Sequence, residues 1–373
     1  MRFELPGASL RFRALDERAT RIVRTELDPY VPTTTDEDAD ADLDVVSTDQ
    51  LALRFADIQN PAGDGRVTAS DGSRLYLLEG DRACSLPRFD TGTPYRFECM
   101  PDFPLRALMR AVLRPALQLA MLDHDTVVVH GATVEHDGRG TVVAGWSESG
   151  KTETALAFLE QGARFVSDKW TVLPNGARVS PFPISVGVRR WVLPFLPRLR
   201  RELPRSARAQ LLAAAAASAV TRPLRRARMT GPIGRTAAAA ASRAVALADR
   251  AALTPSQLAR AYGADRPLET APLRALVFLT TVSDDNVSAR VSDAVTIARR
   301  LARSASYERG PFFDLLRRMR FSLADVSAEF ELSVERREEE LLTKRLEGVN
   351  LLDVHAPFPT DPRRVADAIA AWL

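Results

Sequence analysis

The stretch that decides the fold is GTVVAGWSESGKT, residues 140–152. Its last eight residues, 145–152, match the pattern GxxxxGK[ST] in full. The apolar run 140–144 before the match is typical of a buried strand. Residues 153–161 after it have helical spacing, and Gly162 is placed as a helix C-cap. A strand, a glycine-rich loop and a helix in this order predict a phosphate-binding P-loop.

The chemistry of such a loop depends on its backbone and on two side chains. Backbone N–H groups of a glycine-rich loop can surround phosphate oxygens, and the helix N-terminus adds partial positive charge. Lys151 would reach the β- and γ-phosphates, and the hydroxyl of Thr152 would ligate Mg²⁺. The alternative is a glycine-rich turn that binds nothing. The predicted nucleotide-binding residues are Gly145, Ser147, Glu148, Ser149, Gly150, Lys151, Thr152 and Glu153.

A magnesium nucleotide site also needs a carboxylate at the end of a nearby strand. The apolar run 163–167 leads into Asp168 soon after the P-loop helix, so Asp168 is the candidate metal ligand or base. Its alternative role is to cap a turn. Glu153 lies in the first helical turn, where it either reaches the metal or only interacts with the helix dipole. The predicted metal-binding residues are Thr152, Asp168 and Glu153.

Two further polar positions lie at the ends of strand-like runs. His130 ends the apolar run 126–130, which directly precedes the P-loop strand. A lone histidine at a strand end is usually structural, but this position also suits a site residue, so both roles stay open. Arg189 and Arg190 are interpreted as a solvated strand end, with stabilisation of a transferring phosphate as the alternative.

The chain changes in character along its length. Residues 1–100 have short apolar runs between turn clusters, which predicts a β-rich N-terminal region. Strand-like and helical runs follow up to residue 373, as in an α/β sheet covered by helices. Within this part, residues 197–266 are rich in Ala and Arg and are interrupted by prolines, which predicts several helices. We therefore expect an α/β fold whose catalytic domain, 101–373, carries a helical insert at about 197–266.

Composition and charge restrict the function classes. The chain has 373 residues, a formal net charge of +3 and a pI near 9.1, which is too mild to imply nucleic acid by itself. Cys84 and Cys99 give no metal-ligand spacing and no disulfide framework. No apolar run has the length of a membrane helix, and no apolar signal-peptide segment follows the first charges. We expect a soluble cytoplasmic protein that binds no membrane.

The P-loop and its surroundings resemble the catalytic domain of HPr kinase/phosphorylase and the wider superfamily of HPr-kinase-like proteins. That family has a P-loop of the form GxSGxGKSE, and residues 145–153 here read GWSESGKTE. The family has a strand ending in His-Gly upstream, as at His130–Gly131, and a strand ending in Asp-Asp downstream. Here the downstream pair is Asp168–Lys169, so a lysine occupies the position of the second aspartate. The resemblance covers about residues 127–173.

The resemblance implies a P-loop kinase core of HPr-kinase type that transfers the γ-phosphate of ATP to a hydroxyl, as bacterial kinases of this superfamily do. Lys151 would hold the phosphates, and Thr152 with Asp168 or Glu153 would arrange Mg²⁺. Asp168 would take the proton from the acceptor hydroxyl, and His130 would orient or tune Asp168. The implied catalytic residues are Asp168, His130 and Lys151, and the implied cofactors are ATP and Mg²⁺. GTP stays open because no base-reading motif is visible.

Two other functions stay open beside the kinase. Lys169 at the catalytic centre favours a nucleotide-binding regulatory or assembly protein with weak or no phosphotransfer. A nucleic-acid-linked ATPase would use the arginine-rich residues 197–266, but the sequence has no apolar run that ends in Asp-Glu. We rank this function last and expect no nucleic-acid partner. The expected partner is a peptide, protein or small molecule with a hydroxyl, and a homo-oligomer stays open.

Overall fold

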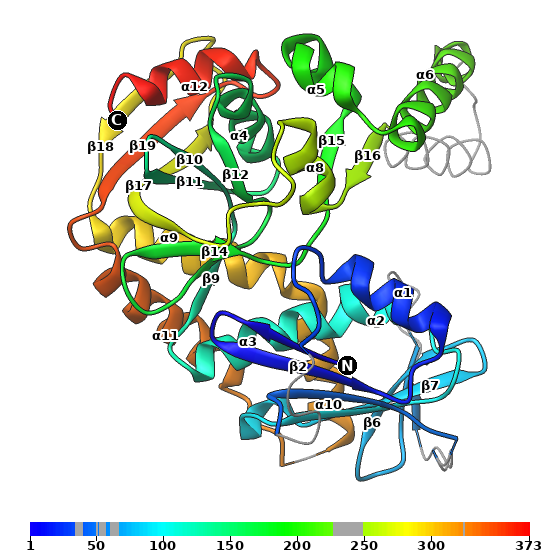
Figure 1. Cartoon of the computed structure of the whole chain (residues 1–373). Coiled ribbons are helices and arrows are strands. Elements are labelled where there is room, and N and C mark those ends of the chain that lie inside the picture. The colour runs from blue at the N-terminus through cyan, green and yellow to red at the C-terminus, as the bar shows by residue number, and fades with distance from the viewer. Residues whose placement is uncertain (34–39, 50, 52–56, 60–66, 227–248, 324) are drawn as a thin grey trace.

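The computed structural model describes residues 1–33, 40–49, 51, 57–59, 67–226, 249–323 and 325–373 (Figure 1). Within these residues the chain is a mixed α/β protein with two large sheets and a separate strand pair. Residues 227–248, which belong to the predicted helical insert, lie outside the described residues.

The predicted P-loop strand is β11 (Arg139–Gly145), at the centre of the larger, mixed sheet. β11 pairs in parallel with β17 (Ala271–Thr281), which pairs in parallel with β19 (Asn350–Ala356). These parallel strands confirm the expectation of an α/β sheet. The other members of this sheet are β12 (Arg164–Ser167), β10 (Gly131–His136), β14 (Arg178–Pro181), β13 (Thr171–Leu173), β9 (Val127–Val129) and β18 (Ser288–Val291).

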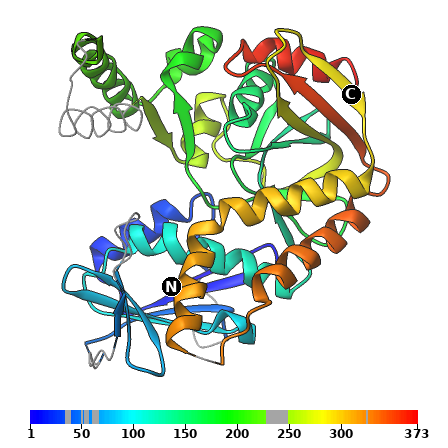
Figure 2. The same cartoon turned by 180° about the vertical axis from the view of Figure 1, so that it is seen from behind.

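Helices cover both faces of this sheet, as Figures 1 and 2 show from opposite sides. α4 (Lys151–Glu160) and α12 (Pro362–Ala370) pack together on one face, and α9 (Ala294–Glu308) and α11 (Phe330–Arg345) on the other. The sheet has a hydrophobic core on each face, and alternate residues of β11 belong to different cores. Val143 faces α4 and α12, and Val142 faces α9 and α11. The P-loop therefore lies at the edge of both cores.

The N-terminal region forms the second sheet, which has eight strands among the described residues. Its strands are β1 (Arg2–Leu5), β2 (Ala8–Arg13), β3 (Leu43–Ser47), β4 (Asp57–Gln59), β5 (Val67–Ser70), β6 (Leu75–Glu79), β7 (Arg82–Leu86) and β8 (Tyr95–Cys99). Its apolar side chains share one core with α3 (Arg114–Asp123), α10 (Gly310–Ser322) and one face of the larger sheet. The division into domains at residues 100 and 101 stays a prediction.

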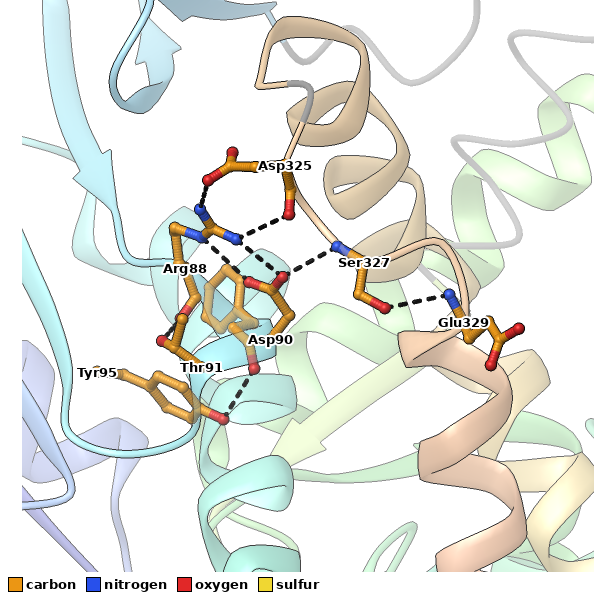
Figure 3. A network of polar contacts seen from close by, with 8 residues as sticks. Arg88, Asp90, Thr91, Tyr95, Asp325, Ser327 and Glu329 are labelled. Atoms are coloured by element: carbon orange, nitrogen blue, oxygen red, sulfur yellow. Dashed lines mark hydrogen bonds and ion pairs between the residues drawn. The ribbon is translucent and has the colours of Figure 1, made fainter.

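Polar contacts also join the N-terminal sheet to the C-terminal helices (Figure 3). Arg88, which follows β7, donates to the carboxylate of Asp90 at 3.0 Å and to the carbonyl oxygen of Asp325 at 3.2 Å. The carboxylate of Asp90 accepts from the backbone N–H of Ser327 at 3.0 Å. These bonds hold the connection between α10 and α11 against the connection between β7 and β8.

The expectation of no disulfide framework is wrong for the two cysteines. Cys84 on β7 and Cys99 on β8 are directly paired across the two strands and form a disulfide. Residues opposite each other on adjacent strands have close Cβ atoms. The proximity of the two cysteines therefore depends on strand pairing, which their sequence separation does not reveal.

The predicted insert is not entirely helical. It contains α5 (Pro197–Glu202), α6 (Arg205–Arg226), α8 (Pro255–Ala261) and also a strand, β16 (Arg250–Leu253). β16 pairs with β15 (Val186–Arg189), and its alternate residues Ala251 and Leu253 are buried. This short alternation is hidden within an alanine-rich segment, where helix propensity misleads. In the described part of the chain, no helix is long and apolar enough to cross a membrane.

Candidate functional site

The predicted P-loop lies between the end of β11 and the start of α4. Gly145 ends the strand with φ of 151°, and a Cβ there would lie 2.6 Å from the carbonyl oxygen of Leu279. Gly150 is the N-cap of α4 with φ of 93°, a conformation that favours glycine. The backbone path therefore requires both glycines of the motif. Strand, loop and helix occur at the positions that the sequence predicts.

Lys151 is buried at the first position of α4. Its Nζ donates to the carbonyl oxygen of Trp146 at 2.6 Å, so the side chain folds back over the loop. Burial lowers the pKa of Lys151 to about 8, and the nearby acids Glu308, Asp168 and Glu153 oppose this shift. The side chain thus places a buried, hydrogen-bonded amine at the loop.

Thr152 and Asp168 are joined by a hydrogen bond. The hydroxyl of Thr152 donates to Oδ1 of Asp168 at 2.7 Å. Burial raises the pKa of Asp168, and the bond from Thr152 opposes that rise. Oδ2 of Asp168 and Oγ of Ser149 are buried and have no hydrogen-bond partner among the residues that the structure describes. Buried polar atoms are normally satisfied, so these two oxygens suit a site that receives a polar ligand or a cation.

Arg189 reaches the P-loop from the end of β15. Its Nη2 donates to Glu148 at 2.6 Å, and its Nε lies 4.0 Å from the carboxylate of Glu153. Burial raises the pKa of Glu153, and Arg189 opposes this effect. Arg189 ends β15 and its side chain is partly exposed, so its role at a transferring phosphate stays a prediction. Arg190 instead pairs with Asp249.

His130 is buried between β9 and β10, and its contacts lead to α9. Nδ1 of His130 lies 3.0 Å from Oγ of Ser304, and Nε2 lies 3.9 Å from Oε1 of Glu308. Burial, followed by the charges of Lys151 and Lys169, lowers the pKa of His130 to about 2. The ring is therefore neutral near pH 7. Its implied role in orienting Asp168 stays a prediction.

The last turn of α9 contributes site residues that the sequence analysis missed. Ser304 lies against His130, the ring of Tyr307 stacks on Trp146 with centroids 4.5 Å apart, and Glu308 lies 3.8 Å from Nζ of Lys169. The apolar spacing of α9 indicates which face of the helix is buried, but not which loop that face meets. No local signal could have identified these residues.

The predicted metal-binding residues are only partly together. Thr152 and Asp168 are in contact, whereas Glu153 is directed towards Arg189. Across the described ranges, no three His, Cys, Asp or Glu side chains are grouped closely enough to hold a metal ion. A cation at Thr152 and Asp168 would need further oxygens from a ligand or from water. Mg²⁺ is usually bound in that way, by one or two carboxylates together with substrate phosphates.

Comparison with known proteins gives a distant structural likeness and no match in sequence. No protein-family model matches the chain, and no curated protein matches it in sequence. Among solved structures, the chain is similar to the Hpr(Ser) kinase/phosphatase from Coxiella burnetii, with 10% sequence identity and a TM-score of 0.28. The match covers 65% of this chain and 88% of that chain. A TM-score this low supports no conclusion about fold or function.

Proposed function

We propose that this protein is an ATP-dependent kinase that transfers the γ-phosphate to a hydroxyl of a peptide, a protein or a small molecule. The observation that carries the proposal is the hydrogen bond of 2.7 Å between Thr152 and Asp168, beside the buried amine of Lys151. In P-loop enzymes the P-loop hydroxyl and a strand-end aspartate together hold Mg²⁺, and the lysine binds the phosphates. Here all three groups converge on one helix N-terminus.

The donor set fits MgATP. Backbone N–H groups at the start of α4 point towards the loop, and Lys151 adds positive charge for the phosphates. Thr152 Oγ1 and the unpartnered Oδ2 of Asp168 are hard oxygen donors, which Mg²⁺ prefers. The metal would neutralise charge on the β- and γ-phosphates. GTP remains an alternative nucleotide, because the proposal rests only on phosphate-binding groups.

The residues of the site would mainly position and neutralise charge. Lys151 would hold the γ-phosphate in line with the acceptor hydroxyl, while Thr152 and Asp168 would keep the metal in place. In the transfer, the acceptor oxygen bonds to the γ-phosphorus, the bond from that phosphorus to the β–γ bridging oxygen breaks, and ADP leaves. The hydroxyl proton passes to a carboxylate, for which the resemblance suggests Asp168.

The test of the function is a transfer assay. Purified protein is incubated with MgATP and with candidate hydroxyl acceptors, such as peptides and metabolites encoded or made by neighbouring genes. We expect ADP and a phosphoryl mass adduct on one acceptor, and no adduct with Asp168→Asn. Tight MgATP binding without an adduct on any acceptor would contradict the proposal.

The second candidate is a nucleotide-binding regulatory or assembly protein with weak or no transfer. The observation in its favour is Lys169, whose ammonium occupies the place of a second acidic residue and lies 3.8 Å from Glu308. It predicts that the parent protein and Asp168→Asn both bind nucleotide and that neither turns it over. A parent protein with turnover that Asp168→Asn lacks would exclude it.

A further inference from the structure

Three residues in the last turn of α9 form a wall of the site. Ser304, Tyr307 and Glu308 have i, i+3 and i+4 spacing, so they project from one face of the helix. Ser304 donates to the carbonyl oxygen of Gly145 at 3.2 Å, and Tyr307 stacks on Trp146. The wall thus contacts the first two residues of the P-loop, whereas α4 continues from its last two.

Two carboxylates, Asp168 and Glu308, reach the surroundings of the P-loop from different elements. Asp168 accepts from Thr152, which is the metal side of the loop. Glu308 comes from the wall that contacts Trp146, the residue whose carbonyl oxygen accepts from Lys151. The charges of Glu308 and Asp168 both oppose the effect of burial on the pKa of Lys151. Glu308 therefore belongs to the side of the site where Lys151 bonds to Trp146.

The hydroxyl of Ser304 joins His130 to the P-loop. It lies 3.2 Å from the carbonyl oxygen of Gly145 and 3.0 Å from Nδ1 of His130. A serine hydroxyl has one proton, which serves one of these two contacts. The neutral ring therefore carries its own proton on Nδ1 or on Nε2, and Nε2–H is available where Nδ1 accepts from Ser304.

Nε2 of His130 and Oε1 of Glu308 face each other at 3.9 Å, which is too far for a direct hydrogen bond. This arrangement suits a group that lies beside both, donates its proton to Oε1 and accepts from Nε2–H. Lys169 approaches the other oxygen of Glu308, Oε2, at 3.8 Å and leaves Oε1 towards His130. A hydroxyl group is a donor of the required kind, and the reaction proposed above needs one close to Lys151.

Asp168 is poorly suited to meet that hydroxyl. Its Oδ1 already accepts from Thr152, and only 4% of the residue is exposed. Its remaining oxygen, Oδ2, is buried and has no hydrogen-bond partner among the described residues. Asp168 can serve a cation there, which leaves the proton of the acceptor to another carboxylate.

We propose that Glu308 is the general base of the transfer and that Nε2 of His130 orients the acceptor hydroxyl towards it. This inference rests on the kinase function proposed above. The O–H bond of the acceptor breaks and its proton goes to Oε1 of Glu308, while the acceptor oxygen bonds to the γ-phosphorus and ADP leaves. Lys169 holds Glu308 in position. The resemblance places a second carboxylate at residue 169, where this chain has a lysine. Glu308 on α9 would provide that carboxylate instead.

The experiment uses the full chain, MgATP and water as the acceptor. Glu308→Gln keeps the size of the side chain and removes the base, and Glu308→Asp keeps the carboxylate. Lys169→Met/Glu308→Gln removes both members of the ion pair. Glu339→Gln is the matched control, because it removes a carboxylate of α11 that pairs with Arg299 away from the site. MgATP affinity is measured by calorimetry and phosphate release by a continuous assay.

We expect Glu308→Gln to bind MgATP within about threefold of the parent and to release phosphate about 100-fold more slowly or worse, as the loss of a general base does. Glu308→Asp should recover part of the rate, and Glu339→Gln should match the parent. The double variant should stay slow, since the base is still absent.

Three results would overturn the base role and leave the kinase function standing. The first is a parental rate in Glu308→Gln. The second is a parental rate in the double variant, which would mean that Glu308 only neutralises Lys169. The third is a parent that binds MgATP and releases no phosphate to water. A parent that binds no MgATP contradicts the kinase function itself.

Discussion

The guanidinium of Arg309 and the carboxylate of Glu338 form an ion pair inside the protein, where their side chains are 1% and 2% exposed. Nη1 of Arg309 donates to Oε1 of Glu338 at 2.7 Å, and Nη2 donates to Oε2. Arg309 directly follows Glu308 at the junction of α9 and α10. The pair therefore fixes the end of α9 against α11 and, with it, the position of the wall beside the P-loop.

Breaking this pair on one side should be strongly destabilising. We expect Arg309→Met to lower the free energy of unfolding by about 3–5 kcal/mol, because Glu338 is left as an uncompensated buried charge. Arg309→Met/Glu338→Leu should recover most of this loss, since no buried charge remains. Urea denaturation of the parent, the single variant and the double variant measures both values.

The surface pair of Arg88 and Asp325 is the control for that prediction (Figure 3). The side chains of Arg88 and Asp325 are 32% and 75% exposed, so water screens their charges. Asp325→Asn removes the exposed member of this pair and should change the free energy of unfolding by at most about 1 kcal/mol. An equal loss in Asp325→Asn and Arg309→Met would mean that burial does not govern these pairs.

Local features of the sequence predicted the part of the site that comes from neighbouring residues in the chain. The glycines, Lys151 and Thr152 lie where the motif places them, because a strand, a tight loop and a helix N-terminus are determined by nearby residues. Asp168 was predicted correctly as a strand-end carboxylate near Thr152, since β12 follows α4 after a short connection.

The other half of the site depends on tertiary packing. Ser304 and Glu308 lie more than 150 residues beyond Gly145 in the chain, and only the packing of α9 against β11 brings them to the loop. The disulfide of Cys84 and Cys99 depends in the same way on the pairing of β7 with β8. Periodicity shows which face of an element is buried, but it does not identify the element on the other side.

The hydrogen bond from Thr152 to Asp168 gives a prediction about metal binding. Thr152→Val keeps nearly the same shape but removes the donor to Oδ1 of Asp168. The loss of this hydrogen bond to a buried carboxylate should cost about 1–3 kcal/mol of stability. It should also abolish the extra thermal stabilisation that Mg²⁺ adds to ADP, because the variant loses an oxygen ligand. Melting temperatures with ADP and Mg²⁺, and with ADP and EDTA, measure this difference.

Thr152→Ser is the matched control, because it keeps the hydroxyl and loses only a methyl group. It should retain the difference between Mg²⁺ and EDTA. If Thr152→Val retained that difference as fully as Thr152→Ser, the hydroxyl would not belong to the metal site.

Lys151 gives a prediction about pH. Its pKa in the folded protein is about 8, below the value of 10.5 for a free lysine, so folding disfavours its charged form. Below pH 8 the lysine is charged in both states, and the folded state carries the full penalty of about 3 kcal/mol. Between pH 8 and 10.5 the unfolded chain binds more protons, so stability due to this group rises with pH.

Lys151→Met should therefore stabilise the nucleotide-free protein while abolishing MgATP binding. The gain in unfolding free energy should be largest at pH 7 and should decrease towards pH 10. Lys344→Met, at an exposed position, should give no such gain at either pH. A gain for Lys151→Met that is the same at pH 7 and pH 10 would show that the charge of the ammonium is not its cause.

Gly145 gives the last prediction, which separates backbone strain from steric overlap. A Cβ at Gly145 would lie 2.6 Å from the carbonyl oxygen of Leu279 and 2.6 Å from Oγ of Ser149, whereas a Cβ at Gly162 would meet nothing within 4 Å. Both glycines have positive φ, so Gly162→Ala should cost about 1–2 kcal/mol from strain alone. Gly145→Ala should cost more and should abolish MgATP binding, because β11 or the loop must move. Denaturation and calorimetry on both variants measure these effects, and parental MgATP affinity in Gly145→Ala would show that the loop tolerates the overlap.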